Sequence, residues 1–282
     1  MSSGIIAPAF VAQFDAEVKQ AYQGMAKLQG TLRTKNGVIG STHRFTKISK
    51  GLAGLHTPHA DVTPMGLDYS TATATLADYV APEYSDIFQQ QKINFDERRE
   101  LVMSVSGALG RRWDQSAIDA MNASGTTNTV AVGVGGSNAF NMGKLRRIGK
   151  QMDALGVPSS DRHLAWSATA KEQLLGTTQA TSSDYNSVMA LVSGQIDTFY
   201  GFKFHLIEDR AEGGLTLAGN NRTLLAWHKE AVGVAVGIDR KTEINYVPEK
   251  VSWLVNGKLA LGSVAIDAEG ISSITIDESV AV

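Results

Sequence analysis

Apolar residues near the start of the chain recur at the spacing of an α-helix. Phe10, Phe14, Val18 and Tyr22 stand four residues apart, which predicts an amphipathic helix over residues 8–30. A helix so placed has little local sequence to pack on. We therefore expect it to lie on the body of the protein or on a neighbouring chain.

The pattern changes over residues 31–85, where Thr, Ser, Gly and Ala replace most of the charged residues. Residues 42–49 and 67–80 are strand-like, with a period of two. The stretch between them, 50–66, carries the glycines and prolines of a turn-rich tip. We expect one long hairpin whose faces have too few large apolar side chains for a core. Because an isolated two-stranded hairpin is marginal in water, it needs a partner surface.

A strong helical pattern follows. Asn94 with Glu97 forms a potential capping box that opens a helix over residues 95–122. Such a helix is about 40 Å long. Gly107 and Gly110 lie inside it, which suggests a bend or a close crossing by another segment. Its apolar stripe comprises Leu101, Val105, Ala108, Leu109, Trp113, Ala117 and Met121.

The rest of the chain mixes helices and strands. A helix begins at Ser137 or Asn141 and is stopped by Gly156-Val157-Pro158. An order of terminal helix, hairpin, long helix, mixed region and strands predicts an α+β fold. The further expected elements are a strand at 162–166, helices from the Ser167 cap to Gly176 and over 184–193, and strands at 196–207, 223–228, 231–237, 241–247, 251–256, 259–266 and 271–276.

Composition narrows the class of protein. The chain has 282 residues, 43% of them hydrophobic and 19% charged, which suits one large or two small domains with a core. The net charge of −2 indicates neither a nucleic-acid nor a membrane partner, and no apolar stretch approaches the ~20 residues of a membrane span. The absence of cysteine excludes disulfides and thiolate nucleophiles. With no signal-peptide pattern at its start, the chain is expected to be soluble and intracellular.

The candidate chemical sites are weak. The Gly-rich stretch Gly133–Gly136 precedes a helix, but a dinucleotide-binding loop would have its third glycine where Asn138 stands. A surface loop is favoured, and a phosphate-binding loop of a soluble α/β enzyme stays open as an alternative. His56 and His59 lie in the turn-rich tip without a third ligand, so a metal site is not expected there. No serine satisfies the nucleophile-elbow motif, and we expect no catalytic residue and no cofactor.

Basic residues and histidines allow two interpretations. Lys144, Arg146, Arg147 and Lys150 form a cluster that we place on the polar side of its helix. A solvated face is the default interpretation of this cluster, and loose contact with phosphates around a DNA-filled space is the sharper one. The histidines that sit singly on strand-like segments, interpreted as surface or core-edge residues, are His43, His163, His205 and His228.

Three stretches together resemble the major capsid proteins of tailed bacteriophages, which share the Hong Kong-type capsid fold. The first runs from Lys144 through Gly156-Val157-Pro158 to the strand ending at Trp166. The second runs from Gly194 through Gly201-Phe202 to Leu206. The third comprises the strand-like segments between Ala231 and Ile266. The resemblance spans nearly the whole chain.

The resemblance implies an α+β capsid fold with an N-terminal arm, an extended β-hairpin loop, a long spine helix, and peripheral and axial domains. The expected divisions are an arm at 1–30, the hairpin loop at 31–85, a peripheral domain with the spine helix at 86–160, an axial domain at 161–238, and C-terminal strands that complete the peripheral domain at 239–282.

The function that the resemblance implies is that of a structural protein, not an enzyme. Such subunits self-assemble into hexamers and pentamers of an icosahedral head that encloses double-stranded DNA, within a virion assembled in the host cytoplasm. A separate scaffolding protein is expected, since the chain shows no long charged helical extension, together with a portal and a cement or decoration protein. An encapsulin-like shell that holds protein cargo is the alternative. The residues expected at intersubunit contacts are Phe10, Phe14, Lys47, Lys50, Leu52, Leu55, Arg98, Arg99, Arg111 and Arg112.

Some members of that family join a hairpin lysine to an asparagine of a neighbouring subunit with the help of a glutamate. Lys47 or Lys50 could serve as the lysine, and Asn256 lies near the place of the acceptor. Where the family pattern has its glutamate, residues 261–264 supply no carboxylate. We therefore interpret Asn256 and the following glycine as a turn, and expect a shell without covalent cross-links.

Overall fold

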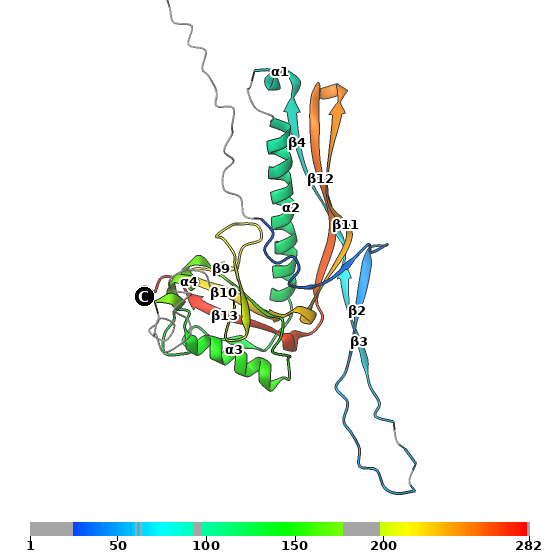
Figure 1. The fold of residues 1–282 in the computed structure, drawn as a ribbon, viewed down its shortest axis with the longest axis vertical. Coiled ribbons are helices and arrows are strands. Elements are labelled where there is room, and N and C mark those ends of the chain that lie inside the picture. Colours follow the sequence, from blue (N-terminus) through cyan, green and yellow to red (C-terminus); the bar gives the residue numbers. More distant parts are fainter. Residues whose placement is uncertain (1–24, 60, 63, 93–96, 177–197, 281–282) are drawn as a thin grey trace, which may run out of the picture.

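The computed structural model describes residues 25–59, 61–62, 64–92, 97–176 and 198–280. The chain forms a long four-stranded sheet beside a long helix, a second region built on a seven-stranded sheet, and a two-stranded hairpin that projects from the junction (Figure 1). This architecture confirms the predicted α+β class.

The long sheet has the strand order β1-β11-β12-β4. It comprises β1 (Arg33–Asn36), β4 (Ala77–Asp86), β11 (Val232–Val247) and β12 (Ser252–Ala265). The last two strands pair antiparallel along their whole length and are joined by the 3₁₀ turn Pro248–Lys250 (η2), whereas β1 pairs parallel to β11.

The sequence pattern divided each of these two long strands in two, and both divisions are wrong. In β11 the predicted break coincides with register irregularities between Val236 and Lys241, so the ladder bulges but does not end. In β12 the predicted turn at Asn256 is absent, because Asn256 pairs with Glu243 on one side and with Pro82 on the other. A glycine within a strand marks a close approach of another element as readily as a turn.

The predicted spine helix is α2 (Glu97–Asn122), which runs alongside the long sheet (Figure 1). Its buried face includes Val105, Leu109, Trp113, Ala117 and Met121, five members of the predicted stripe. Gly257 of β12 faces this helix, and a side chain at that position would run into Val105 and Leu109. The short helix α1 (Ile87–Gln90) follows β4 at the end of the long sheet where α2 begins (Figure 1).

The second region is built on a seven-stranded sheet of order β5-β13-β10-β6-β8-β7, with β9 paired to β10. Two capped helices accompany it, α3 (Met142–Ala154) and α4 (Ala168–Leu175), and their predicted caps Asn141 and Ser167 are confirmed. The strands are β5 (Thr129–Val130), β6 (Arg162–Trp166), β7 (Thr198–Phe199), β8 (Phe202–Leu206), β9 (Leu217–Ala218), β10 (Asn221–His228) and β13 (Ile271–Asp277).

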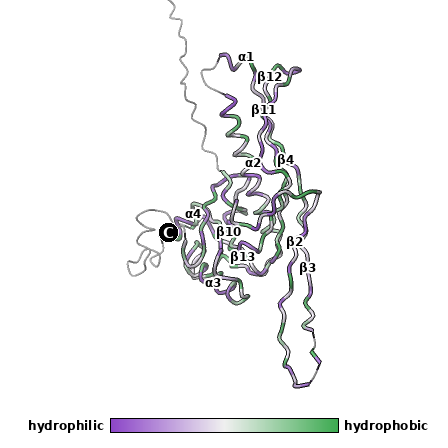
Figure 2. The backbone as a smooth tube through the Cα atoms, turned by 45° about the vertical axis from the view of Figure 1, so that its right-hand side comes forward, coloured by the Kyte–Doolittle hydropathy of each residue, from purple (hydrophilic) through white to green (hydrophobic). Residues whose placement is uncertain are grey.

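The hairpin consists of β2 (Thr42–Ile48) and β3 (Tyr69–Thr75), which pair antiparallel. Figure 2 shows it extending away from both sheets. The single strand predicted over 67–80 is split, because the chain passes at Leu76 from the hairpin into β4 of the long sheet.

Several expectations fall partly or wholly outside the described residues. Of the helix predicted over 8–30, residues 25–30 form bends and turns instead, so the helix prediction is wrong there. Phe10, Phe14, the Asn94 cap and the helix expected over 184–193 lie outside the described residues.

Candidate intersubunit surfaces

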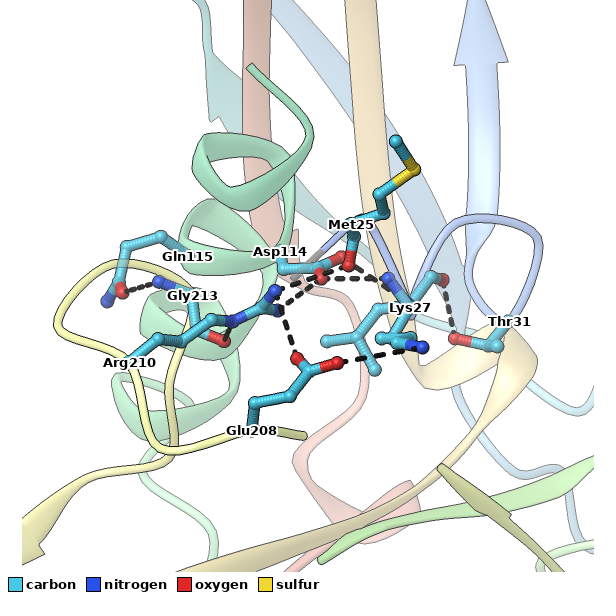
Figure 3. A network of polar contacts seen from close by, with 9 residues as sticks. Met25, Lys27, Thr31, Asp114, Gln115, Glu208, Arg210 and Gly213 are labelled. Atoms are coloured by element: carbon cyan, nitrogen blue, oxygen red, sulfur yellow. Dashed lines mark hydrogen bonds and ion pairs between the residues drawn. The ribbon is translucent and has the colours of Figure 1, made fainter. Parts of the chain in front are cut away.

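The chain enters the body through a strap, residues 25–32, that crosses α2. The backbone amides of Lys27 and Leu28 donate hydrogen bonds to the two carboxylate oxygens of Asp114, at 2.8 and 3.1 Å (Figure 3). Leu28 and Leu32 are buried in the main core. The crossing is close because α2 has a glycine there: a Cβ on Gly110 would lie 3.1 Å from the amide nitrogen of Ala26. The crossing segment expected from the helix glycines is thus the strap.

An ion-pair network fixes the strap from the other side. Arg210 donates to Asp114 at 2.7 Å, and its guanidinium also contacts Met25 O at 3.2 Å and Glu208 at 3.3 Å (Figure 3). The Asp114 side chain is fully buried. Burial raises the pKa of Asp114 above its usual value, while the amides of Lys27 and Leu28 and the charge of Arg210 oppose that rise. The strap, α2 and the loop before β9 are therefore held as one unit.

The sequence pattern missed this network. Asp114 and Arg210 are 96 positions apart, and no local pattern joins them. The one available signal was the position of Asp114 in the helix. It stands four residues after Gly110 and four before Ile118, directly beside the apolar stripe, where a charged residue needs a buried partner.

The root of the hairpin packs on the long sheet. Phe45 and Ala74 are buried against Ala235 of β11. Glycines of the sheet make this approach feasible: a Cβ on Gly233 would lie 2.7–2.8 Å from atoms of the Phe45 ring. A Cβ on Gly262 would run into the carbonyl oxygen of Thr75. The hairpin root thus packs on the body through a small apolar contact, here called its seat, which the sequence pattern did not predict.

Two lysines predicted to contact other subunits anchor the hairpin within this chain. Lys47 forms an ion pair with Asp267 at 2.7 Å, and Lys50 forms one with Glu269 at 2.7 Å. Lys50 also donates to the carbonyl oxygen of Leu155 at 3.2 Å. The hydrogen bond with Glu269 raises the pKa of Lys50 above its usual value. Both pairs are partly or largely exposed, so solvent screens them and each contributes little to stability.

Beyond these lysines the hairpin tip presents apolar side chains to solvent. Leu52 is 86% exposed, Leu55 100% and Val62 84%. Exposed apolar patches are typical of interaction sites. Leu52 and Leu55 were predicted as intersubunit contacts, and within this chain they are available for that role.

The four arginines of α2 divide by environment. The guanidinium of Arg112 lies 4.3 Å from the ring centroid of Tyr79 and 3.7 Å from Glu212, so it ties α2 to its own chain. Arg98 stacks at 5.4 Å over Trp253 of the sheet. Arg111 is partly buried, and Arg99 is exposed. Arg99 alone of the four presents an exposed cation, and its intersubunit role stays a prediction.

A lysine of α3 holds the segment that follows the Gly-rich stretch Gly133–Gly136. The Lys144 ammonium donates at 2.6 Å to the carbonyl oxygens of Ser137 and Ala139, and desolvation lowers the pKa of Lys144 to about 8. Lys144 is fully buried, so its placement on the solvated face is wrong. The amide of Lys144 is capped by Asn141, which removes one donor that a phosphate-binding helix start would offer.

Two histidines that the sequence showed singly are brought together on neighbouring strands. His163 Nδ1 of β6 and His205 Nε2 of β8 are 2.9 Å apart, and the His163 ring stacks on Trp227 of β10 at 5.8 Å. Burial and the nearby His205 and Lys203 lower the pKa of His163 to about 4, and burial also lowers that of His205. The pair is therefore neutral at pH 7. No sequence signal joined the two histidines, because the pairing of β6 with β8 is long-range.

Within the described residues, no group of three or more histidine, cysteine, aspartate or glutamate side chains is arranged to hold a metal ion. None of the helices in that part of the chain is both long and apolar enough to cross a membrane.

The fold of this chain is similar to that of solved phage capsid structures. A chain of the head structure of Helicobacter pylori bacteriophage KHP40 matches with a TM-score of 0.80 and 10% identity, over 98% of each chain. The capsid of cyanophage P-SCSP1u matches with a TM-score of 0.76 and 16% identity, over 95% of this chain and 93% of that one. The capsid of cyanophage Pam1 gives 0.74 and 10%, over 99% and 100%.

The sequence itself shows the family. The family model described as "Phage capsid protein" matches residues 6–278, nearly the whole chain. No curated protein sequence matches. The chain belongs to the phage capsid protein family, has the Hong Kong-type fold expected from the sequence, and is a structural major capsid protein of a bacteriophage.

Proposed function

We infer that this chain is the repeating subunit of a closed icosahedral phage head. Copies assemble into hexamers and pentamers, and the resulting shell encloses double-stranded DNA. The observation that carries this inference is the hairpin: its root packs on the body, Lys47 and Lys50 tie it there by exposed ion pairs, and beyond them its tip exposes Leu52, Leu55 and Val62. A monomer gains nothing from such an extension, whereas burial of its apolar surface against a second copy contributes roughly 25 cal/mol per Å².

The proposed partners follow the same scheme. Other copies of the chain receive the hairpin tip and the arm, a separate scaffolding protein sets the particle size, and a portal and a cement or decoration protein complete the head. Assembly takes place in the host cytoplasm. Shells of uniform, correct size from this chain expressed alone would contradict the scaffolding part of the proposal.

The hairpin tip gives the direct test. The triple variant Leu52→Ser/Leu55→Ser/Val62→Ser removes the exposed apolar side chains and keeps the length of the tip. Melting of the unassembled subunit should be unchanged, because these side chains are exposed, and the yield of particles by sedimentation should fall at least tenfold. The matched control His56→Ser/Thr57→Ser/Asp61→Ser changes three exposed polar residues of the same tip and should assemble normally. Equal assembly by both variants would contradict the proposed role of the tip.

A further inference from the structure

The outer face of α3 carries three exposed cations that are not used by the part of the chain that the structure describes. Arg146, Arg147 and Lys150 are exposed, and across the described residues their side chains form no hydrogen bond or ion pair. The opposite face of α3, with Leu145, Ile148 and Met152, is fully buried in the core. The three cations therefore project from a helix that the core holds rigidly.

Repulsion among these cations destabilises α3. Lys150 stands four residues after Arg146 and three after Arg147, so both pairs bring like charges together on one face. None of the three lies in the last turn, where a cation would offset the helix dipole. The acidic residue of the helix, Asp153, is held by Arg162 at 2.7 Å. Residues that destabilise the element on which they lie are expected at functional surfaces.

The charge of this face differs from that of the whole chain. The chain carries a net charge of −2, yet α3 contributes four basic residues and one acidic residue. A concentration of positive charge on one exposed helix face attracts a polyanion. Duplex DNA carries one phosphate per 3.4 Å of each strand, and α3 at about 20 Å in length extends past several of them.

We propose that Arg146, Arg147 and Lys150 of α3 contact the phosphate backbone of the packaged double-stranded DNA. The proposal rests on the proposed function, because it requires a shell filled with DNA. It orients the subunit, since the α3 side of the seven-stranded region must then face the interior of the shell. Phosphate contacts do not distinguish one base from another, so binding through these three side chains is independent of the DNA sequence.

The test is a titration of the full-length, unassembled subunit against a fluorescent 20-base-pair duplex at several salt concentrations, read by anisotropy. The triple variant Arg146→Gln/Arg147→Gln/Lys150→Gln should bind more weakly, and its slope of log K against log salt should be shallower by about 2.7, for three lost phosphate contacts. The variant Arg146→Lys/Arg147→Lys should bind like the wild type, because phosphates require charge and not a bidentate donor.

A matched control removes the same charge elsewhere. Lys35→Gln/Arg44→Gln/Lys92→Gln changes three exposed cations outside α3 and should leave the salt slope unchanged. Equal slopes for the α3 triple variant and the wild type would overturn the proposal and leave an acidic protein partner as the occupant of this face. Equal losses in both triple variants would also overturn it, since binding would then follow net charge alone.

Two further readouts separate folding and assembly from DNA binding. The α3 variants should melt at or slightly above the wild-type temperature, because like-charge pairs are removed. If the triple variant melts early, the double variant Arg146→Gln/Lys150→Gln takes its place, with an expected change in slope of about 1.8. Electron microscopy of the wild type reports on shell formation: absence of particles contradicts the proposed function, whereas unchanged DNA binding by the α3 variants contradicts this proposal alone.

Discussion

At the scale of single residues, buried charge decides how the N-terminal strap is held. Asp114 accepts hydrogen bonds from two strap amides and pairs with Arg210, whose side chain is only 9% exposed. Removal of one partner from such a pair leaves the other charge buried and uncompensated, which costs far more than the pair contributes. Loss of a single member of this network is therefore expected to destabilise the attachment of the strap.

Asp114→Ala should lower the free energy of unfolding by about 2–5 kcal/mol, because it leaves two strap amides without their acceptor and removes the buried carboxylate that pairs with Arg210. Urea denaturation of the unassembled subunit measures this loss. Asp119→Ala, an exposed position on the same helix, is the control and should change stability by less than about 0.5 kcal/mol. Similar losses for the two variants would show that the network does not hold the strap.

The His163–His205 pair should make the fold sensitive to acid. The pKa of His163 is about 4 in the folded chain and 6.5 without the fold, so between these values the unfolded chain binds more protons. The contribution of His163 to the free energy of unfolding is complete above pH 6.5. It falls as the pH is lowered toward 4, by at most about 1.4 kcal/mol per pH unit for one group. The lowered pKa of His205 acts in the same direction.

Denaturation midpoints measured from pH 7 to pH 4.5 test this effect. His163→Gln removes one titrating group and should flatten the decline relative to the wild type. The exposed tip residue His56 provides the control, since His56→Gln should leave the decline unchanged. Parallel declines for the wild type and His163→Gln would contradict the assignment.

At the scale of elements, the hairpin is seated through glycines of the long sheet. Gly233→Val places a side chain where the Phe45 ring lies, 2.7 Å from the position of its Cβ. The hairpin root should lose its seat, at a cost of about 1–3 kcal/mol. Trypsin should then cut faster after Lys47 and Lys50, whose ion pairs depend on that seat. The control variant Thr242→Val, on the same strand, should be cleaved by trypsin at the wild-type rate. If Gly233→Val is also cleaved at the wild-type rate, the proposed role of this glycine is contradicted.

Some of these elements were predictable from the sequence and others were not. Periodicity and caps placed α3 and α4 closely, because Asn141, Ser167 and Gly156 are local signals. The hairpin followed from its period of two. The continuity of β11 and β12 did not, because a bulge and a glycine within a strand are indistinguishable from turns until the neighbouring strands are known.

Among candidate site residues, the sequence identified the exposed tip but not the contacts that organise the molecule. Leu52 and Leu55 were recognisable from their surroundings of glycine and proline. Lys144 was misplaced because its long stem packs in the core while its ammonium reaches two carbonyl oxygens. The partnerships of Asp114 with Arg210 and of His163 with His205 are long-range, and no local pattern encodes them.

At the scale of the whole molecule, the shell is expected to hold without covalent cross-links. Lys47 and Lys50 are engaged by Asp267 and Glu269. Glu243 lies opposite Asn256 in the sheet, so a carboxylate is present that residues 261–264 did not offer. Its hydrogen bonds with Lys258 and Lys241 lower the pKa of Glu243 to about 2, which makes it a poor proton acceptor at neutral pH.

Mature particles boiled in denaturing detergent should therefore return one band near the chain mass of 30.1 kDa. The reason is that ion pairs and buried apolar surface do not survive such treatment, whereas an isopeptide bond does. A ladder of multimers that persists after boiling, and that disappears in Lys47→Gln or Lys50→Gln, would contradict a non-covalent shell.

The central claim is that this chain forms a shell through its own projecting surfaces, and negative-stain electron microscopy of the purified full-length chain tests it most directly. The expected images show capsomer rings and curved or closed shells for the wild type, irregular in size without a scaffolding partner. Replacement of residues 50–66 by a short Gly-Ser turn should abolish these assemblies while the subunit melts as before. A wild-type chain that stays dispersed as monomers at every concentration and salt condition would contradict the claim.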